Sequence, residues 1–276
     1  MITERITVRD DRFQRFETLK RNREKRFRQK LAFTEGVQPI EQAIKHGWQF
    51  YAMAVADGVR LSGWAENMIK DGKPDILYKT SPALMAELSD RDDPCEIIAL
   101  VKMRTDGLER IKKADSGNPM YALFDRPASP GNLGTFLRSA DAFGAAGAIV
   151  TGHAADFYDT ACIRGSVGTV FAIPFGELSG AEEAVEWLRS LPSRPVIIGT
   201  SAKASIDISQ VDLTGPAALV IGNETFGLSK AWKDLCDELV TIPICGAASS
   251  LNAGSAATVC FYEISRQRRA EEQKGS

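Results

Sequence analysis

The chain has 276 residues, of which 44% are hydrophobic and 25% are charged, and its formal net charge is −2. This composition indicates an ordinary globular protein of one large domain or two modest ones. Because no apolar run approaches the roughly 20 residues of a membrane span, and because the first residues are charged, we expect neither a transmembrane helix nor a signal peptide.

Cysteine and histidine usage restricts the possible chemistry. The five cysteines are scattered and form no Cys-x-x-Cys pair, which is typical of reduced thiols in a cytoplasmic protein. The two histidines, His46 and His153, have no partner at metal-ligand spacing. We therefore expect a cytoplasmic protein without a metal site.

Residues 1–32 form a predicted basic N-terminal arm. Residues 1–30 hold eleven Lys or Arg against five acidic residues, so positive charge is concentrated at one end of a nearly neutral chain. Such a distribution is typical of nucleic-acid binding. The alternative interpretation is a solvated helix.

A small α/β domain is predicted over residues 33–104, followed by a linker over residues 105–118. The linker is polar and contains the turn-forming runs Asp106-Gly107 and Ser116-Gly117-Asn118-Pro119. In the small domain helices alternate with strands. Helices are expected at 37–46, 63–70 and 82–88, and strands at 50–55, 75–79 and 96–101.

The larger domain is predicted over residues 119–276. Its expected strands are short, continuous and rich in β-branched residues, as buried parallel strands are. The fold class is therefore α/β with a mostly parallel sheet. Strands are expected at 120–125, 148–151, 169–174, 196–200, 217–221 and 238–242, and helices near 133–143, 158–164, 180–191, 229–236 and 251–269.

The first candidate site lies between the strand at 120–125 and the helix that follows it. Loops at this position bind ligands in open α/β sheets. Asn132 is suited either to a ligand contact or to capping the helix N-terminus. Arg138 stands among small and apolar residues, where a guanidinium commonly pairs with a carboxylate or a phosphate.

The second candidate site is the loop from Gly222 to Ser229. Gly222 and Gly227 have the spacing of a phosphate-binding loop, but Leu228-Ser229 replaces the Lys-Ser/Thr that a nucleoside-triphosphate site requires. No Gly-x-Gly-x-x-Gly follows a strand, which argues against a dinucleotide site as well. The loop carries one carboxylate, Glu224, which is also favourable at a helix N-terminus without any ligand.

The third candidate site runs from Ile242 to Ala257. Small residues dominate it, so its backbone can approach a ligand closely, and Ser250 and Asn252 add directed hydrogen bonds. The alternative is a tightly packed helix. A weaker fourth pattern, Arg164 to Gly168, also fits a helix end closed by glycine.

Loops that follow parallel strands meet at one edge of a sheet, so these sites should lie together. The three main loops bring Arg, Glu, Asn and Ser side chains but no histidine, thiol pair or carboxylate pair. The usual proteolytic, glycosidic and metal-hydrolytic chemistries lack their residues here. Such a site suits a reaction whose reactive group comes from a cofactor.

Together the three segments resemble the three motifs of the SpoU–TrmH family of RNA ribose 2′-O-methyltransferases. The likeness covers about residues 118–266, and residues 33–103 resemble, less sharply, the small substrate-binding domain that precedes the catalytic domain in many members. The matching motifs are Asn132-x-Gly134-x-x-x-Arg138, Gly222-x-Glu224-x-x-Gly227-Leu228, and Ile242-Pro243 with Ser250-Leu251-Asn252.

The resemblance implies a C-terminal trefoil knot and an obligate homodimer in which part of one active site comes from the other subunit. It also implies S-adenosylmethionine as the cofactor, held in a bent shape by the knotted loops. The cofactor contacts that the resemblance implies are Gly222, Ile242, Leu251 and Asn252, with Thr200 as a further candidate.

The resemblance also implies the catalytic roles. Arg138 would grip the phosphate beside the target ribose, or lose a proton to that phosphate before taking one from the 2′-hydroxyl. We favour positioning and charge stabilisation, because a guanidinium is a poor base at neutral pH. Glu224, Ser250 and Asn132 would orient Arg138 and the ribose, and Asn252 would hold the loop, the cofactor or both.

Two departures from the family pattern are visible. Ala253-Gly254 stands where members usually carry Val-Ser, and Thr135-Phe136 replaces a smaller pair before Arg138. The first is expected to alter loop rigidity and the second to place a ring near the substrate side. Neither removes a motif residue, so activity is expected.

The resemblance therefore predicts methyl transfer from S-adenosylmethionine to a ribose 2′-hydroxyl of structured RNA. Ribosomal RNA of the 23S type is favoured because of the separate N-terminal domain, with tRNA as the rival substrate. An alternative that is not an enzyme is a non-catalytic RNA-binding or ribosome-assembly factor with the same fold. A nucleotide-dependent enzyme is disfavoured by the missing lysine.

Overall fold

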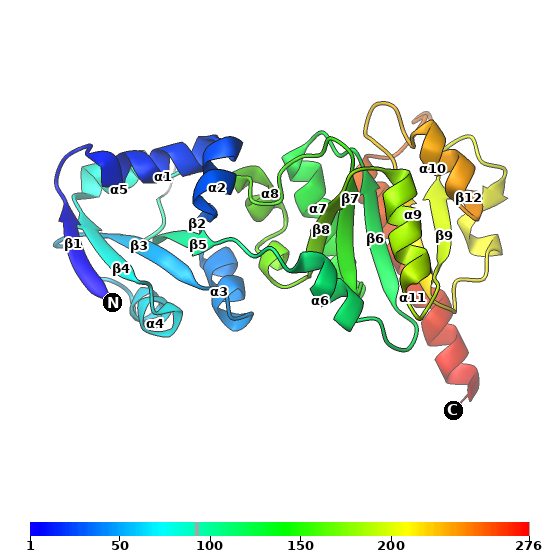
Figure 1. The fold of residues 1–276 in the computed structure, drawn as a ribbon, viewed down its shortest axis with the longest axis horizontal. Helices are drawn as coiled ribbons and strands as arrows, with labels where there is room; N and C mark the ends of the chain where they lie inside the picture. The colour runs from blue at the N-terminus through cyan, green and yellow to red at the C-terminus, as the bar shows by residue number, and fades with distance from the viewer. Residues whose placement is uncertain (92–93, 276) are drawn as a thin grey trace. The chain divides into compact units, whose positions relative to one another are not determined.

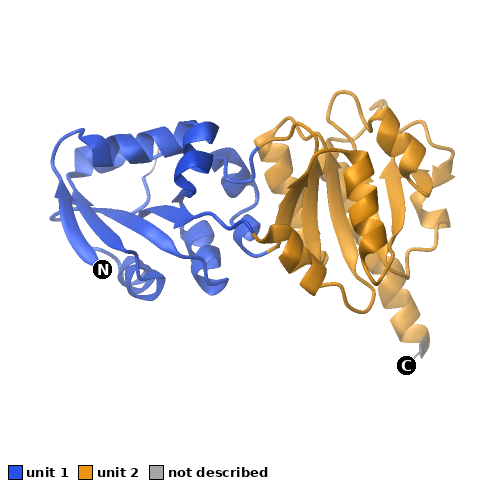
Figure 2. Cartoon of the chain, viewed as in Figure 1, with its two compact units in different colours: residues 1–105, 156–172 blue, residues 106–155, 173–276 orange. Residues whose placement is uncertain are grey.

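A computed structural model describes residues 1–91 and 94–275, and its contacts divide the chain into two units (Figure 2). Unit 1 comprises Met1–Thr105 and Asp156–Ala172, and unit 2 comprises Asp106–Ala155 and Ile173–Ser276. Neither unit is a single continuous stretch of chain. The expected boundary near residues 105–118 is therefore only one of three crossings between the units.

Unit 1 is built on a five-stranded mixed sheet with strand order β1-β4-β3-β5-β2. The strands β1, β4 and β3 run parallel, and β5 pairs antiparallel with both β3 and β2. The strands are β1 (Ile2–Ile6), β2 (Leu31–Glu35), β3 (Phe50–Ala56), β4 (Ile76–Thr80) and β5 (Ile98–Lys102). The helices are α1 (Asp11–Arg21), α2 (Arg23–Gln29), α3 (Val37–Lys45), α4 (Gly63–Gly72), α5 (Pro82–Leu88) and α8 (Thr160–Gly165).

The expected basic arm is an integral part of unit 1. Strand β1 adds an edge to the sheet through β4, and Phe13 and Phe16 of α1 pack in the same core cluster as Phe33 of β2. Two of its basic side chains are buried: Lys20 donates to the carbonyl of Leu88, and Arg26 is only 1% exposed. An apolar helix face and a strand segment thus hold the positive charge close to the body of the unit.

Residues 156–172 return to unit 1 and are fixed there by polar contacts. The Arg26 guanidinium forms ion pairs with Asp156 at 2.7 Å and with Asp159 at 3.2 Å. The indole nitrogen of Trp48 donates to the carbonyl oxygen of Phe171 at 2.7 Å. Residues 156–172 therefore supply both buried polar partners and buried apolar side chains to unit 1.

The strand expected at 169–174 is wrong. The structure has a 3-10 turn at η1 (Thr169–Phe171), and the strand β8 (Phe175–Leu178) begins only after Pro174. Gly168 has a left-handed backbone (φ +84°) and lies so close to Pro39 that a Cβ would collide with its backbone. This tight turn prevents an extended chain, although its β-branched residues favour a strand.

Unit 2 is built on a seven-stranded sheet with order β10-β12-β9-β11-β6-β7-β8, and every pair in it is parallel. The mostly parallel α/β sheet that the sequence predicts is confirmed. The central strands are buried along their whole length, which explains their continuous apolar sequences. The strands are β6 (Met120–Asp125), β7 (Gly147–Thr151), β8, β9 (Val196–Thr200), β10 (Ile206–Asp207), β11 (Ala217–Ile221) and β12 (Glu238–Thr241).

Helices cover both faces of this sheet (Figure 1). On one face α9 and α10 bury Leu188 and Trp232 in a cluster with Tyr121 of β6. On the other face Phe136 of α7 packs between Phe124 of β6 and Phe261 of α11, with ring centroids 5.2 and 5.7 Å apart. The helices are α6 (Gly107–Lys113), α7 (Pro130–Ala142), α9 (Ala181–Ser190), α10 (Lys230–Leu235) and α11 (Ala253–Gly275).

The expected linker at 105–118 contains the short helix α6. Its Ile111 is buried in the core cluster of unit 2 and packs so closely on Gly147 of β7 that an added Cβ would collide with the Ile111 side chain. Only residues after α6 form the predicted polar turn. Within the part of the chain that the structure describes, no helix is long and apolar enough to cross a membrane.

Candidate active site

A cleft of about 430 Å³ opens in unit 2 at the carboxyl ends of β9, β11 and β12 and at the start of α11. Parallel sheets bind ligands at this edge, as the sequence analysis anticipates. Six predicted site residues line the cleft, and they come from the second and third motif regions and from β9. They are Thr200, Gly222, Glu224, Ile242, Ser250 and Leu251.

Gly222 shows why the second loop needs a glycine at its entrance. A Cβ at this position would collide with the backbone of Gly227 and Leu228, because the loop turns back tightly on its own start. The backbone N–H of Asn223 donates to the Gly227 carbonyl at 3.1 Å, and that of Gly227 donates to the Asn223 carbonyl at 2.9 Å. The loop is a closed turn whose residues line the cleft.

A chain of hydrogen bonds joins the three motifs. The Asn132 amide donates to Glu224 at 3.1 Å, and the Asn252 amide donates to the Asn132 carbonyl oxygen at 3.0 Å. The backbone N–H groups of Ala128 and Ser129 also donate to the Glu224 carboxylate, at 2.9 and 3.0 Å. These hydrogen bonds hold the three motif segments next to one another, although the segments are distant in sequence.

These donors control the charge of Glu224. Burial by itself raises the pKa of this carboxyl group, but the hydrogen bonds from the backbone N–H groups of Ala128 and Ser129 and from the Asn132 amide outweigh it. The net effect is a pKa below the ordinary value of 4.5. Glu224 is therefore a carboxylate at neutral pH, and it acts as an acceptor only.

The two asparagines have different local roles. Asn132 does not cap helix α7, because Ser129 occupies that position and its hydroxyl accepts from the Asn132 backbone N–H at 3.3 Å. Asn252 does serve as a cap, since its side-chain oxygen accepts from the backbone of Gly254 at 2.9 Å at the start of α11. Its amide donates to Asn132, so the Asn252 side chain both caps α11 and takes part in the hydrogen bonds that join the three motifs.

Arg138 stands apart from the cleft. It lies on the exposed side of α7, roughly 9 Å further along the helix axis than Asn132. No hydrogen bond or ion pair joins its guanidinium to another residue of the ranges 1–91 and 94–275. The structure therefore brings together every predicted site residue except this one, which faces outward on the helix that carries Asn132.

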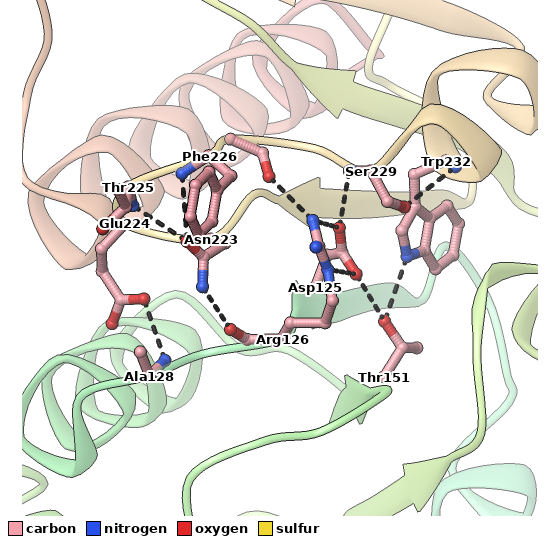
Figure 3. A network of polar contacts seen from close by, with 11 residues as sticks. Asp125, Arg126, Ala128, Thr151, Asn223, Glu224, Thr225, Phe226, Ser229 and Trp232 are labelled. Carbon is pink, nitrogen blue, oxygen red and sulfur yellow. Dashed lines mark hydrogen bonds and ion pairs between the residues drawn. The ribbon is translucent and has the colours of Figure 1, made fainter.

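A buried carboxylate behind the second loop is a feature that sequence reasoning missed. Asp125, at the end of β6, accepts from the Ser229 backbone N–H at 2.8 Å, from the Thr151 hydroxyl at 3.3 Å and from the Arg126 guanidinium at 3.0 Å (Figure 3). The Trp232 indole donates to Thr151 at 3.1 Å. An acid ending an otherwise apolar strand is the signal that could have revealed it.

Arg126 ties this network to the loop itself. Its backbone has a positive φ of 51°, and its carbonyl oxygen accepts from the Asn223 amide at 2.7 Å. Its guanidinium reaches the Gly227 carbonyl at 3.3 Å. The strained backbone is thus held by bonds on both sides, and the loop has a fixed support below it.

The expectation that Phe136 places a ring near the substrate side is wrong. Its side chain is fully buried between the sheet and α11, so the larger residue serves the core. The aromatic residue that does reach the cleft is Phe226, in the second loop. The lysines Lys203 and Lys233 also line the cleft and were not anticipated.

A parallel α/β sheet with glycine-containing loops around a cleft at its carboxyl edge defines a class of ligand-binding enzymes. Within that class, residues 119–262 match the SpoU rRNA Methylase family and residues 10–99 match the SpoU L30e-like domain. The chain belongs to the SpoU rRNA methylase family. The resemblance proposed from its three motifs is confirmed.

Individual relatives support this assignment along nearly the whole chain. A 23S rRNA (uridine(2479)-2′-O)-methyltransferase of Streptomyces viridochromogenes is 43% identical over 269 residues, covering 96% of this chain and 92% of that protein. A putative TrmH family tRNA/rRNA methyltransferase of Bacillus subtilis, YacO, is 31% identical, covering 84% of this chain and 94% of that protein. The crystal structure of the SpoU methyltransferase AviRb from Streptomyces viridochromogenes with AdoMet aligns with a TM-score of 0.87 and 41% identity, over 95% of this chain and 99% of that one.

Proposed function

We propose that the protein transfers a methyl group from S-adenosylmethionine to a ribose 2′-hydroxyl of 23S rRNA. The observation that carries this proposal is the chain Glu224–Asn132–Asn252, which joins the cofactor cleft to the helix that bears Arg138. A relative that covers nearly the whole chain is named for this activity. The solved structure of a similar enzyme holds the same cofactor.

The cleft residues fit the cofactor. Gly222 permits a turn that is too tight for any side chain at that position, and residues of the second and third loops line the cleft together. Thr200, Ile242, Leu251 and Asn252 complete the proposed binding set. S-adenosylmethionine supplies an electrophilic methyl group on sulfur, and the protein's part is to position the acceptor oxygen against it.

Arg138 is proposed to act on the RNA. Its outward position and the absence of a bonded carboxylate among the described residues leave the guanidinium available for a backbone phosphate. A guanidinium stays protonated at neutral pH, so gripping the phosphate and stabilising charge on the 2′-oxygen are its proposed contributions. Ser250, exposed in the cleft, and Glu224 with Asn132 would orient the ribose.

The enzyme is proposed to be a homodimer. Helix α11 packs on α7 and presents Val259 and Tyr262 outward, 40% and 50% exposed, with the Tyr262 ring 6.1 Å from that of Phe143 at the end of α7. Two apolar side chains one turn apart on a packed helix pair suit an interface between copies. A cytoplasmic location is proposed because the substrate is ribosomal and all five cysteines are free thiols.

Mapping of ribose methylation tests the proposed function. We expect one 2′-O-methyl group to disappear from 23S rRNA when the gene is deleted and to return with the wild-type gene but not with an Arg138→Ala variant. A loss of ribose methylation confined to tRNA would make tRNA, rather than 23S rRNA, the substrate. Unchanged ribose methylation throughout total RNA would contradict the activity and favour the assembly-factor alternative.

A further inference from the structure

Phe226 is an aromatic side chain at the rim of the cleft whose exposure the fold does not require. It is 77% exposed, whereas Leu228 and Val240, which line the same cleft, are buried. No aromatic contact joins its ring to the rest of residues 1–91 and 94–275. A large apolar group that contributes nothing to a core and lies at a binding cleft indicates a contact with a ligand.

The ring is presented by a rigid turn. The side-chain oxygen of Asn223 accepts from the backbone N–H groups of Thr225 at 2.9 Å and of Phe226 at 3.1 Å (Figure 3). Asn223 is itself tied to Arg126 below the loop. The exposed ring is therefore attached to a backbone whose position is fixed before any partner binds, which lowers the entropy lost on binding.

The chemistry around the ring suits a nucleic-acid base. Lys203 and Lys233 line the same cleft with exposed side chains, so this cleft holds both cationic groups and an exposed aromatic ring. Single-stranded nucleotides are held by this combination of base stacking and phosphate attraction. Glu224, two residues before Phe226, belongs to the network that faces the proposed reaction centre.

We propose that Phe226 stacks on the base of the RNA nucleotide that is methylated, and thereby places its ribose at the reaction centre. This inference rests on the proposed function, because it assumes an RNA substrate in this cleft. Stacking is tolerant of base identity, since every base has a flat face. Phe226 thus contributes to holding the nucleotide and leaves sequence selection to other contacts.

Steady-state kinetics on an unmodified 23S rRNA transcript tests the role of the ring. We expect Phe226→Ala to raise KM for RNA about tenfold with a smaller effect on kcat, as for loss of a stacked base. Phe226→Tyr keeps the ring and should remain near wild type. Phe226→Leu keeps an apolar side chain without a flat face and should resemble the alanine variant. Equal KM values for all four proteins would overturn the proposal.

Two further measurements on the same variants separate the other possible partners of Phe226. Calorimetric titration with S-adenosylmethionine should give unchanged Kd values, and light scattering should give unchanged molar masses. A weaker cofactor Kd with unchanged RNA KM would assign the ring to the cofactor, and a lower mass would assign it to a subunit contact. Either result refutes stacking on RNA.

Failure of the proposed function has a different signature. If the wild-type protein transfers no methyl group to the transcript, the function itself fails, whatever the variants do. If the wild type is active and Phe226→Ala is indistinguishable from it, only the stacking inference fails.

Discussion

Arg138 and Glu224, two residues proposed to act in one site, are held very differently by the fold. Glu224 accepts from three donors, the backbone N–H groups of Ala128 and Ser129 and the Asn132 amide, whereas Arg138 is exposed on α7. The Glu224 side chain is fixed by its hydrogen bonds, whereas the exposed Arg138 side chain is not held by such bonds among the described residues. Substitutions at the two positions should therefore have different consequences.

Arg138→Ala should lower kcat for methyl transfer to RNA by about 10²–10³-fold, the usual effect of removing one group that stabilises charge in a transition state. Because Arg138 does not line the cleft, the Kd for S-adenosylmethionine should remain nearly unchanged in a calorimetric titration. Arg189→Ala, which removes an exposed arginine of α9, is the matched control. Substantial turnover by the Arg138 variant would rule out the proposed role.

Glu224→Gln should reduce stability in a pH-dependent way. The folded-state pKa of Glu224 lies below its ordinary value of 4.5, so its carboxylate stabilises the fold above that pH, and the effect is lost as the pH falls through the folded-state pKa. The difference in unfolding free energy between wild type and variant should be present at pH 7 and shrink below about pH 4.5. Chemical denaturation at a series of pH values measures it; a difference that grows on acidification would contradict this account.

At the scale of elements, the second loop depends on its glycine. Gly222→Ala forces a methyl group into the backbone of residues 227 and 228, so we expect the turn to open and the S-adenosylmethionine Kd to rise at least about tenfold. Gly215→Ala is the control, because a Cβ there meets nothing within 4 Å. Calorimetric titration compares the two. Equal affinities would show that the turn does not shape the cofactor cleft.

Helix α2 and residues 156–172 are joined by a buried ion pair, on which the stability of unit 1 should depend. Arg26→Met removes one partner of a buried ion pair with Asp156 and should lower the unfolding free energy by about 3–5 kcal/mol. Arg28→Met, on the exposed side of the same helix, should change it by less than about 0.5 kcal/mol. Urea denaturation followed by circular dichroism provides the comparison. Similar losses in both variants would refute a special role for the buried pair.

The strand pattern of unit 2 could be predicted from its sequence, because β6 and β11 are buried on both faces and read as continuous apolar runs. The motif residues other than Arg138 could be placed together because loops that follow parallel strands meet at one edge of the sheet. The absence of a strand at 169–174 could not be predicted, since the tight packing of Gly168 on Pro39 is a contact between segments distant in sequence. Burial of Arg26 was equally hidden, because its partners lie about 130 residues away. The trefoil knot stays a prediction.

At the scale of the whole molecule, the proposed dimer can be tested on α11. Tyr262→Glu places a charge at the centre of the proposed interface, so we expect the molar mass in light scattering to fall to that of one chain and methyl transfer to be lost. Val196→Glu, at an exposed apolar residue of β9, should leave the mass unchanged. A wild-type mass of a single chain would refute the dimer.

The division of unit 1 into two separated stretches sets the order in which this protein can mature. During synthesis the first 105 residues emerge with Arg26 lacking Asp156 and Trp48 lacking the Phe171 carbonyl. Their fold is completed only when residue 172 has left the ribosome, after β6 and β7 of the other unit have already been made. The first unit therefore cannot be completed before part of the second has been made, and cutting the chain after residue 105 would separate unit 1 from the residues 156–172 that complete it.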